Sequence, residues 1–133
     1  MVKSAAILFG LVFLLVGILG FVPAVTKDEM LLGIFHVNVL HNLVHILFGI
    51  WGLVAAGSLG ASRGYFRGVG VIYAVLAVLG LISAGNIWNT FGFIPIHGAD
   101  VGLHAVLAVA GLYLGFAAKA HDVTEPRRDA PVV

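Results

Sequence analysis

Four polar side chains in this apolar sequence have the spacing of metal ligands. His41 and His45 are four residues apart, and so are Asp100 and His104. Side chains four residues apart on a helix share one face and form a natural chelate for a metal ion. Three imidazoles and one carboxylate, in a chain without cysteine, suit zinc, copper(II) or iron better than copper(I). The spacing therefore predicts a metal site built from these four residues.

Further polar residues flank the two pairs. Asn38 and Asn42 lie beside the first pair, while His36 and His97 lie in the segments that precede the two helices. Imidazoles that bind metals usually hold their second ring nitrogen in a hydrogen bond, so we expect these four residues to surround and orient the ligands. Asn38 is also suited to cap the helix that carries the first pair.

Other interpretations of the histidines stay open. His45 and His104 form a symmetric pair with a small residue one turn below each, and bundles ligate haem b with one histidine from each of two facing helices. A single histidine can likewise bind the magnesium of a bacteriochlorophyll. Alternatively these side chains form a buried polar network, in which His41 bonds Asp100 while His45 and His104 bond backbone carbonyls of the loops. Asp100 could also simply cap its own helix. The chain would then be an accessory or structural subunit.

Several other function classes are poorly supported. The sequence shows no nucleophile-and-base spacing, no phosphate-binding loop and no carboxylate pair, so we expect no enzyme. Its net charge is only +1, which gives no reason to expect nucleic-acid binding. Four short helices form a small bundle, so transport would require an oligomer. The partners we expect are the lipid bilayer, further copies of the chain and the subunits of a larger membrane complex.

The composition places these residues in a membrane. Hydrophobic residues make up 61% of the 133 residues, charged residues only 10%, and the mean hydropathy is +1.11. Four long uncharged stretches each hold one span of about 20 apolar residues. The first is longer than the apolar core of a signal peptide, which is about 7–15 residues, so we interpret it as a span. The predicted helices lie near 4–25, 39–58, 67–87 and 99–119.

These helices form a single predicted domain, residues 1–120, followed by a charged and disordered tail, 121–133, that contains His121. In the loop after the first helix, we expect the apolar segment 30–35 to lie at the interface or to fold back against the helix ends. We expect residues 57–68 to form a loop with Tyr65 and Phe66 at the level of the lipid headgroups.

The sequence repeats itself once. Positions in the first helical pair correspond in residue type to positions 59 or 60 residues further along the chain. Because each unit contains two spans, both units point the same way across the membrane, and the histidines should converge at one end. The matched residues include Gly10 with Gly70, Phe13 with Tyr73, Gly20 with Gly80, His45 with His104, Gly49 with Ala108, and Gly52 with Gly111.

Basic residues predict the orientation. With four spans, all but one of them fall on the same side, and the exception is Lys27. The positive-inside rule then places both termini in the cytoplasm and the histidines near the extracytoplasmic face. The basic residues on the cytoplasmic side are Lys3, Arg63, Arg67, Lys119, Arg127 and Arg128.

The doubled motif resembles a known family. Its elements are Gly33-Ile-Phe, Asn38-x-x-His41-Asn42-Leu-Val-His45-x-x-x-Gly49 and Ile94-Pro-x-x-x-Ala99-Asp100-x-x-Leu103-His104. These resemble a family of small four-helix bacterial membrane proteins known only as a domain of unknown function, over nearly the whole chain except the tail. The resemblance implies a bacterial integral membrane protein with four spans, and no established activity. From the predicted topology we expect it in the inner membrane. His97-Gly98 and Val101 depart from the family motif, which argues against a family-wide role for His97.

The sequence thus predicts an all-α transmembrane four-helix bundle, built from an internal parallel repeat of two helices, with both termini cytoplasmic. The leading functional hypothesis is an integral membrane protein that binds a metal ion or metallo-cofactor near the extracytoplasmic face. The alternative is a non-enzymatic accessory or structural subunit, whose histidines form a polar network or ligate a haem or a chlorophyll.

Overall fold

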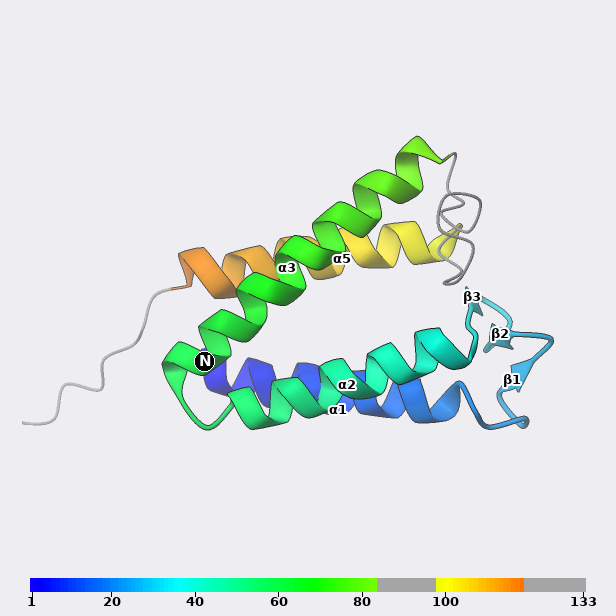
Figure 1. Ribbon diagram of the computed structural model, residues 1–133, viewed down its shortest axis with the longest axis horizontal. Helices are drawn as coiled ribbons and strands as arrows, with labels where there is room; N and C mark the ends of the chain where they lie inside the picture. Colours follow the sequence, from blue (N-terminus) through cyan, green and yellow to red (C-terminus); the bar gives the residue numbers. More distant parts are fainter. Residues whose placement is uncertain (84–97, 119–133) are drawn as a thin grey trace, which may run out of the picture.

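The protein folds as two antiparallel helical hairpins that lie side by side (Figure 1). The computed structural model describes residues 1–83 and 98–118. In this part of the chain α1 pairs with α2, and α3 pairs with α5, whose last turn continues as the π-helical segment η1. The helices are α1 Val2–Leu19, α2 Val39–Ala55, α3 Leu59–Ile82, α5 Ala99–Leu112 and η1 Tyr113–Ala117.

Three of these helices are long and apolar enough to cross a membrane, namely α1, α3 and α5 with η1. The remaining helix, α2, is apolar but has only 17 residues. At 1.5 Å per residue it is about 25 Å long, slightly less than the roughly 30 Å hydrocarbon core of a bilayer. The expected all-helical fold is therefore confirmed for the described residues, and three of the helices are suited to span a membrane.

Two helix boundaries differ clearly from the prediction. Instead of continuing to residue 25, α1 ends at Leu19, whose carbonyl oxygen accepts a 2.8 Å hydrogen bond from the Thr26 hydroxyl after the chain has turned. The other difference concerns α3, which begins at Leu59 rather than near residue 67, because the Ser58 hydroxyl accepts a hydrogen bond from the Ala61 amide and caps the helix. The predicted ends at 87 and 119 lie outside the described residues.

The early start of α3 overturns the prediction of a loop over residues 57–68. Tyr65 and Phe66 are not at an exposed headgroup level, because both side chains are completely buried between the hairpins. The two arginines that made this segment look like a loop reach the far end of the other helix of their hairpin. Arg63 donates to the Ala118 carbonyl at 2.8 Å, and Arg67 donates to the Gly115 carbonyl at 2.9 Å.

The loop between α1 and α2 contains a small antiparallel sheet, which the sequence analysis did not anticipate. Its strands are β1 Thr26–Lys27, β2 Met30–Leu31 and β3 Phe35–His36, in the order β1-β2-β3. The segment expected at the interface therefore pairs with its neighbours by backbone hydrogen bonds, and Leu31 is buried. Contacts between β3 and α5 link this sheet to the second hairpin.

Glycines allow the helices of each hairpin to approach closely. A methyl group placed on Gly10 would lie 2.9 Å from the Gly49 carbonyl oxygen, and one on Gly49 would lie 2.8 Å from the Gly10 carbonyl oxygen. In the second hairpin, a methyl group on Gly111 would lie 2.8 Å from the Gly70 Cα atom. Such small-residue contacts are typical of helices packed within membranes.

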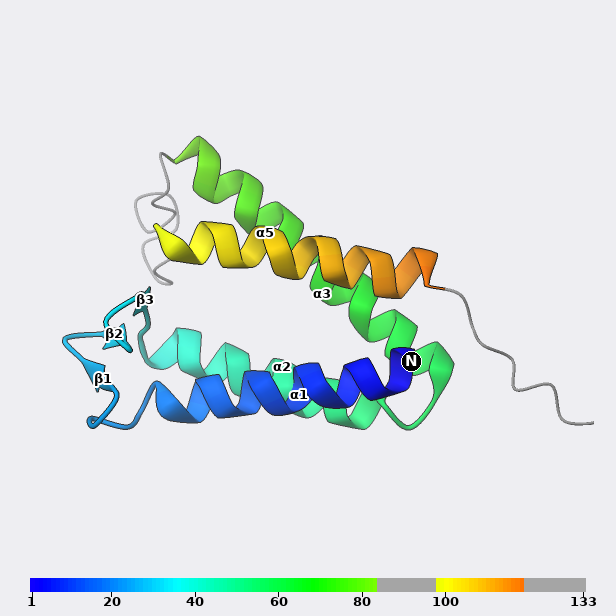
Figure 2. The same ribbon diagram turned by 180° about the vertical axis from the view of Figure 1, so that it is seen from behind.

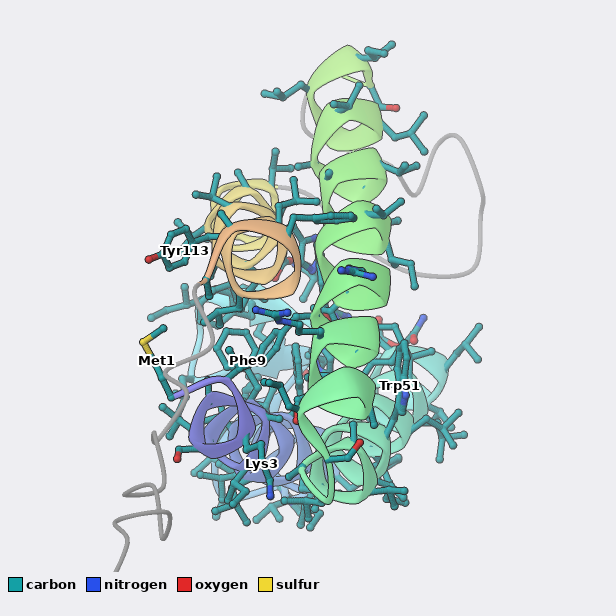
Figure 3. All side chains as sticks on the ribbon, turned by 90° about the vertical axis from the view of Figure 1, so that its left-hand side faces the viewer. Met1, Lys3, Phe9, Trp51 and Tyr113 are labelled. Carbon is teal, nitrogen blue, oxygen red and sulfur yellow. The ribbon has the colours of Figure 1, made fainter. Side chains whose placement is uncertain are left out.

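The two hairpins are joined by aromatic side chains. Seen from behind (Figure 2), α1 and α2 run beneath α3 and α5 over most of their length. The Phe9 ring of α1 packs edge-on against Phe66 of α3, with the ring centroids 5.1 Å apart. In the end-on view (Figure 3), Phe9 lies between α1 and the C-terminal helix, whereas Trp51 and Tyr113 lie on the outer flanks.

Candidate functional site

The first histidine pair is positioned by the N-terminal turn of α2. The Asn38 side chain accepts a 2.8 Å hydrogen bond from the His41 backbone amide, which confirms the predicted N-cap. The His41 ring then donates from Nδ1 to the His36 carbonyl oxygen at 3.1 Å. The backbone carbonyl of His36 therefore orients the His41 ring. One turn further on, the His45 ring lies 4.5 Å from the His41 ring, measured between centroids.

Each hairpin packs one imidazole against one aromatic ring. In the first hairpin, His45 of α2 stacks on Phe13 of α1, with centroids 5.5 Å apart and the planes at 29°. In the second, His104 of α5 packs on Tyr73 of α3 at 4.8 Å and 39°. Phe13 and Tyr73 also stack on each other across the interface, at 5.9 Å and 4°.

These side chains form a continuous buried group, which we call the imidazole–aromatic core. All of its members are at most 8% exposed, and His45 lies within electrostatic range of both His41 and His104. The core thus contains three imidazoles that the sequence predicted would converge, and two rings that it did not assign to the site. Its members are Phe13, His41, His45, Tyr73 and His104.

Two imidazole nitrogens of this core are buried without a protein partner. Within residues 1–83 and 98–118, neither His45 Nδ1 nor His104 Nδ1 makes a hydrogen bond. Buried polar atoms are nearly always hydrogen-bonded, so an exception calls for an explanation such as a ligand or a water molecule. The predicted alternative, in which these two histidines bond backbone carbonyls, does not hold for these two atoms in the described part of the chain.

Asp100 is buried beside the second histidine but does not cap its helix. Gly98 occupies the N-cap position, with a positive φ of 60° and no side-chain cap bond. Asp100 instead lies in the first turn of α5 and is 2% exposed. The interpretation of Asp100 as the N-cap is therefore wrong. A carboxylate in the first helical turn is nevertheless favourable because it faces the positive end of the helix dipole.

Asn42 is buried within the first hairpin. It is 2% exposed, and a methyl group placed on Gly20, the C-cap of α1, would overlap its side-chain amide. At the matching place in the second hairpin, a methyl group on Gly80 would lie 2.8 Å from a Val101 methyl carbon. Asn42 therefore fills the space beside a close helix contact, which is a packing role that its spacing from the histidines did not indicate.

The predicted metal ligands do not form a coordination group as they are placed. In the described parts of the chain, no three side chains of histidine, cysteine, aspartate or glutamate are arranged to hold a metal ion. His41 Nδ1 is engaged by a carbonyl oxygen, and the faces of His45 and His104 are packed on aromatic rings. His97 and His121 lie outside the described residues.

Sequence reasoning missed the part that Phe13 and Tyr73 take in this site. The signal was present, because the repeat aligns Phe13 with Tyr73 just as it aligns His45 with His104. Two matched aromatic residues on the helices that pair with the two histidines predict that each imidazole has an aromatic neighbour. Helical periodicity alone could not show this, because it identifies the face of a helix but not the partner across it.

Comparisons with known proteins agree with the doubled motif. A family model described as "Domain of unknown function (DUF4383)" matches residues 3–117, which include all the described helices apart from Val2, the first residue of α1. Comparison with curated proteins gave no match, and neither did comparison with solved structures.

Proposed function

The chain belongs to the family described as a domain of unknown function (DUF4383), and we propose that it serves as a non-enzymatic structural subunit of a membrane complex. The observation that carries this proposal is the packing of His45 on Phe13 and of His104 on Tyr73. Imidazoles packed in this way help to hold together the two helices of each hairpin, and the stack of Phe13 on Tyr73 joins the hairpins. Large apolar side chains exposed along all the helices offer surfaces to lipid and to neighbouring subunits.

We also propose that the bundle is an internal repeat of two parallel hairpins. Corresponding contacts support this. A methyl group on Gly52 would lie 3.1 Å from the Ala6 carbonyl oxygen, and one on Gly111 would lie 3.1 Å from the Phe66 carbonyl oxygen. Ala6 and Phe66 are 60 positions apart (6 to 66), and the two glycines are 59 apart (52 to 111). The same offsets relate the two imidazole–aromatic pairs.

The proposed location is the bacterial inner membrane, with both termini in the cytoplasm. Lys3, Arg63 and Arg67 belong to the bundle end that carries the N-terminus and the turn from α2 to α3, whereas Lys27 lies in the sheet at the other end (Figure 1). This distribution follows the positive-inside rule. Because the chain has no cysteine, single cysteines can test it. A membrane-impermeant maleimide should label Asp28→Cys and not Ser58→Cys in intact cells, and the reverse pattern would refute the orientation.

Binding of a metal ion or metallo-cofactor is the second candidate function. The unpartnered Nδ1 atoms of His45 and His104 favour it, because each is a buried nitrogen available to a ligand. The groups that suit these donors are zinc, copper or iron ions, and haem b or bacteriochlorophyll bound through His45 and His104. Binding of an ion by three of the predicted ligands would require His41, His45, Asp100 and His104 to rearrange from their present packing.

Elemental analysis of the purified full-length protein, combined with its absorption spectrum, separates the two candidates. The structural proposal predicts colourless, metal-free protein whose melting temperature is unchanged by a chelator. A stoichiometric metal that His45→Ala removes, or a Soret or long-wavelength pigment band, would contradict the structural proposal and support the second candidate. Leu43→Ala is the matched control, because Leu43 is on α2 but 45% exposed.

A further inference from the structure

A groove of about 230 Å³ lies between α1 of the first hairpin and α5 of the second. Five α1 residues between Leu8 and Val16 form one wall, and Leu103 and Leu107 of α5 form the other. His45 of α2 contributes the remaining lining residue. Figure 3 shows one of the wall residues, Phe9, directed from α1 towards the C-terminal helix.

The rim of this groove consists of exposed apolar side chains. Leu8 is 60% exposed, Val12 is 48% exposed and Leu103 is 40% exposed, and all three belong to helices that are apolar enough to cross a membrane. Among the residues that the structure describes, none that lines the groove is charged. A molecule entering it must therefore be soluble in the hydrocarbon region of the bilayer, because water-soluble ions and metabolites would meet only apolar walls at the entrance.

The inner part of the groove is aromatic and has a single polar group. The rings of Phe9 and Phe13 both line it and lie edge to face, 6.1 Å apart. His45 is 92% buried, and its Nδ1 has no partner within the described residues. A neutral imidazole with its proton on Nδ1 can donate one hydrogen bond from this atom. The groove thus offers apolar walls and one buried imidazole whose Nδ1 lacks a protein partner among the described residues.

We propose that this groove binds the headgroup of a lipid-soluble carbonyl compound of the quinone class. The planar ring lies against Phe9 and Phe13, one carbonyl oxygen accepts a hydrogen bond from His45 Nδ1, and the hydrocarbon tail extends into the bilayer past Val12. The volume suits one small ring system, since it is below the roughly 300–1,000 Å³ of pockets for drug-sized ligands. A phospholipid acyl chain would fill the same walls but leave the imidazole nitrogen without a partner.

This inference concerns binding alone and does not depend on the proposed subunit role. To test it, the full-length protein in phosphatidylcholine nanodiscs is titrated with a benzoquinone that carries a ten-carbon tail. Calorimetry measures the binding. Decylbenzene, which has the same tail and no carbonyl, is the comparison ligand. We expect saturable binding of the quinone and at least about tenfold weaker binding of decylbenzene, since only the quinone satisfies the donor.

Variants at the rim test the location without disturbing the core. Val12→Trp should fill the groove and weaken quinone binding at least about tenfold, because Val12 lies in its wall. Val71→Trp is the matched control, since Val71 is 49% exposed on α3 and does not line the groove. At the donor, His45→Phe should weaken binding about tenfold, whereas His45→Gln, which keeps a donor, should restore most of it.

Each outcome decides the proposal. It is overturned if the wild-type protein shows no saturable binding, or if decylbenzene binds as tightly as the quinone, which would identify an acyl-chain site. It is also overturned if Val12→Trp binds as well as Val71→Trp, because the ligand would then lie elsewhere. If His45→Phe fails to fold, the comparison of Val12→Trp with Val71→Trp still decides where the ligand binds.

Discussion

The two hairpins share one packing scheme and differ in the chemistry at the end beside the β-sheet, which we call the outer end (Figure 1). In each, glycines bring the helices into contact, and an imidazole packs on an aromatic ring of the preceding helix. At the outer end, however, the first hairpin buries His41 and Asn42, whereas the second buries Asp100 and Val101. The shared geometry therefore serves the assembly of the bundle, and the differing residues mark where the two halves can take on separate roles.

The opposite ends of the hairpins differ as well. In the second hairpin, Arg63 and Arg67 of α3 reach carbonyl oxygens at the end of η1, and the Arg67 guanidinium lies 5.0 Å from the Phe116 ring centroid. The corresponding positions of the first hairpin, 60 residues earlier, hold Lys3 and Ile7. A π-helical turn leaves irregular carbonyl groups, and the two arginines satisfy those of Gly115 and Ala118.

The largest effect should come from truncating the rings that the hairpins share. Phe13→Ala and Tyr73→Ala should each lower the free energy of unfolding by about 3 kcal/mol, the low end for buried aromatic residues, because lipid removes most of the transfer term. Reversible unfolding in mixed micelles measures this. Phe21→Ala is the control, since Phe21 is 47% exposed. If Phe21→Ala lowers the unfolding free energy equally, the rings between the hairpins contribute no more to stability than an exposed aromatic side chain does.

The next largest effect tests whether the two hairpins are equally close-packed. Gly49→Ala and Gly111→Ala each place a methyl group within 3 Å of backbone atoms, so each should cost about 2–3 kcal/mol of unfolding free energy. Gly102→Ala, with no atom within 4 Å of its added methyl group, should instead stabilise α5 by up to about 1 kcal/mol. Thermal unfolding followed by circular dichroism compares the three. If Gly49→Ala lowers the unfolding free energy and Gly111→Ala does not, the two hairpins are not equally close-packed.

A smaller difference should separate the outer ends. Gly20→Ala displaces the buried Asn42 amide and should cost about 2 kcal/mol, whereas Gly80→Ala displaces a Val101 methyl group and should cost about 1 kcal/mol. Gly20 has a φ of −60°, so backbone strain plays no part. The double variant Gly20→Ala/Asn42→Ala should recover part of the loss. If the double variant is no more stable than Gly20→Ala, the contact with the Asn42 amide is not the cause of the lost stability.

The smallest effect belongs to the arginine end. Arg67→Gln removes the hydrogen bond to the Gly115 carbonyl and should cost about 1 kcal/mol. Lys3→Gln in the first hairpin should change the unfolding free energy by less than about 0.5 kcal/mol, as is usual for exposed positions. Both are measured by the same unfolding assay. If Arg67→Gln and Lys3→Gln lower the unfolding free energy equally, the arginine contacts add no stability beyond that of the positive charge.

Local features were predictable from the sequence. The long apolar stretches predicted the helical membrane fold, and Asn38 predicted a cap because capping depends only on residues three positions apart. The start of α3 was not predictable in the same way. Arg63 and Arg67 resemble loop residues until their carbonyl partners, about 50 positions further along, are in place (63 to 118, 67 to 115).

The candidate site was predictable only in part. Spacing identified which histidines face inward, and His41, His45 and His104 are indeed buried near one another. Spacing could not show that His45 and His104 pack on Phe13 and Tyr73, because that depends on side chains from other helices. The groove between α1 and α5 could not be predicted either. Its width depends on the distance between the two hairpins, and no local sequence pattern determines that distance.

The measurement that tests the account most directly is a double-mutant cycle on Phe13 and Tyr73. These two rings, each packed on one histidine, join the two hairpins. This packing predicts that Phe13→Ala, Tyr73→Ala and the double variant are non-additive, with a coupling energy of about 0.5–1.5 kcal/mol, as for other aromatic pairs. Strict additivity, with a coupling energy near zero, would contradict the central place of the imidazole–aromatic core.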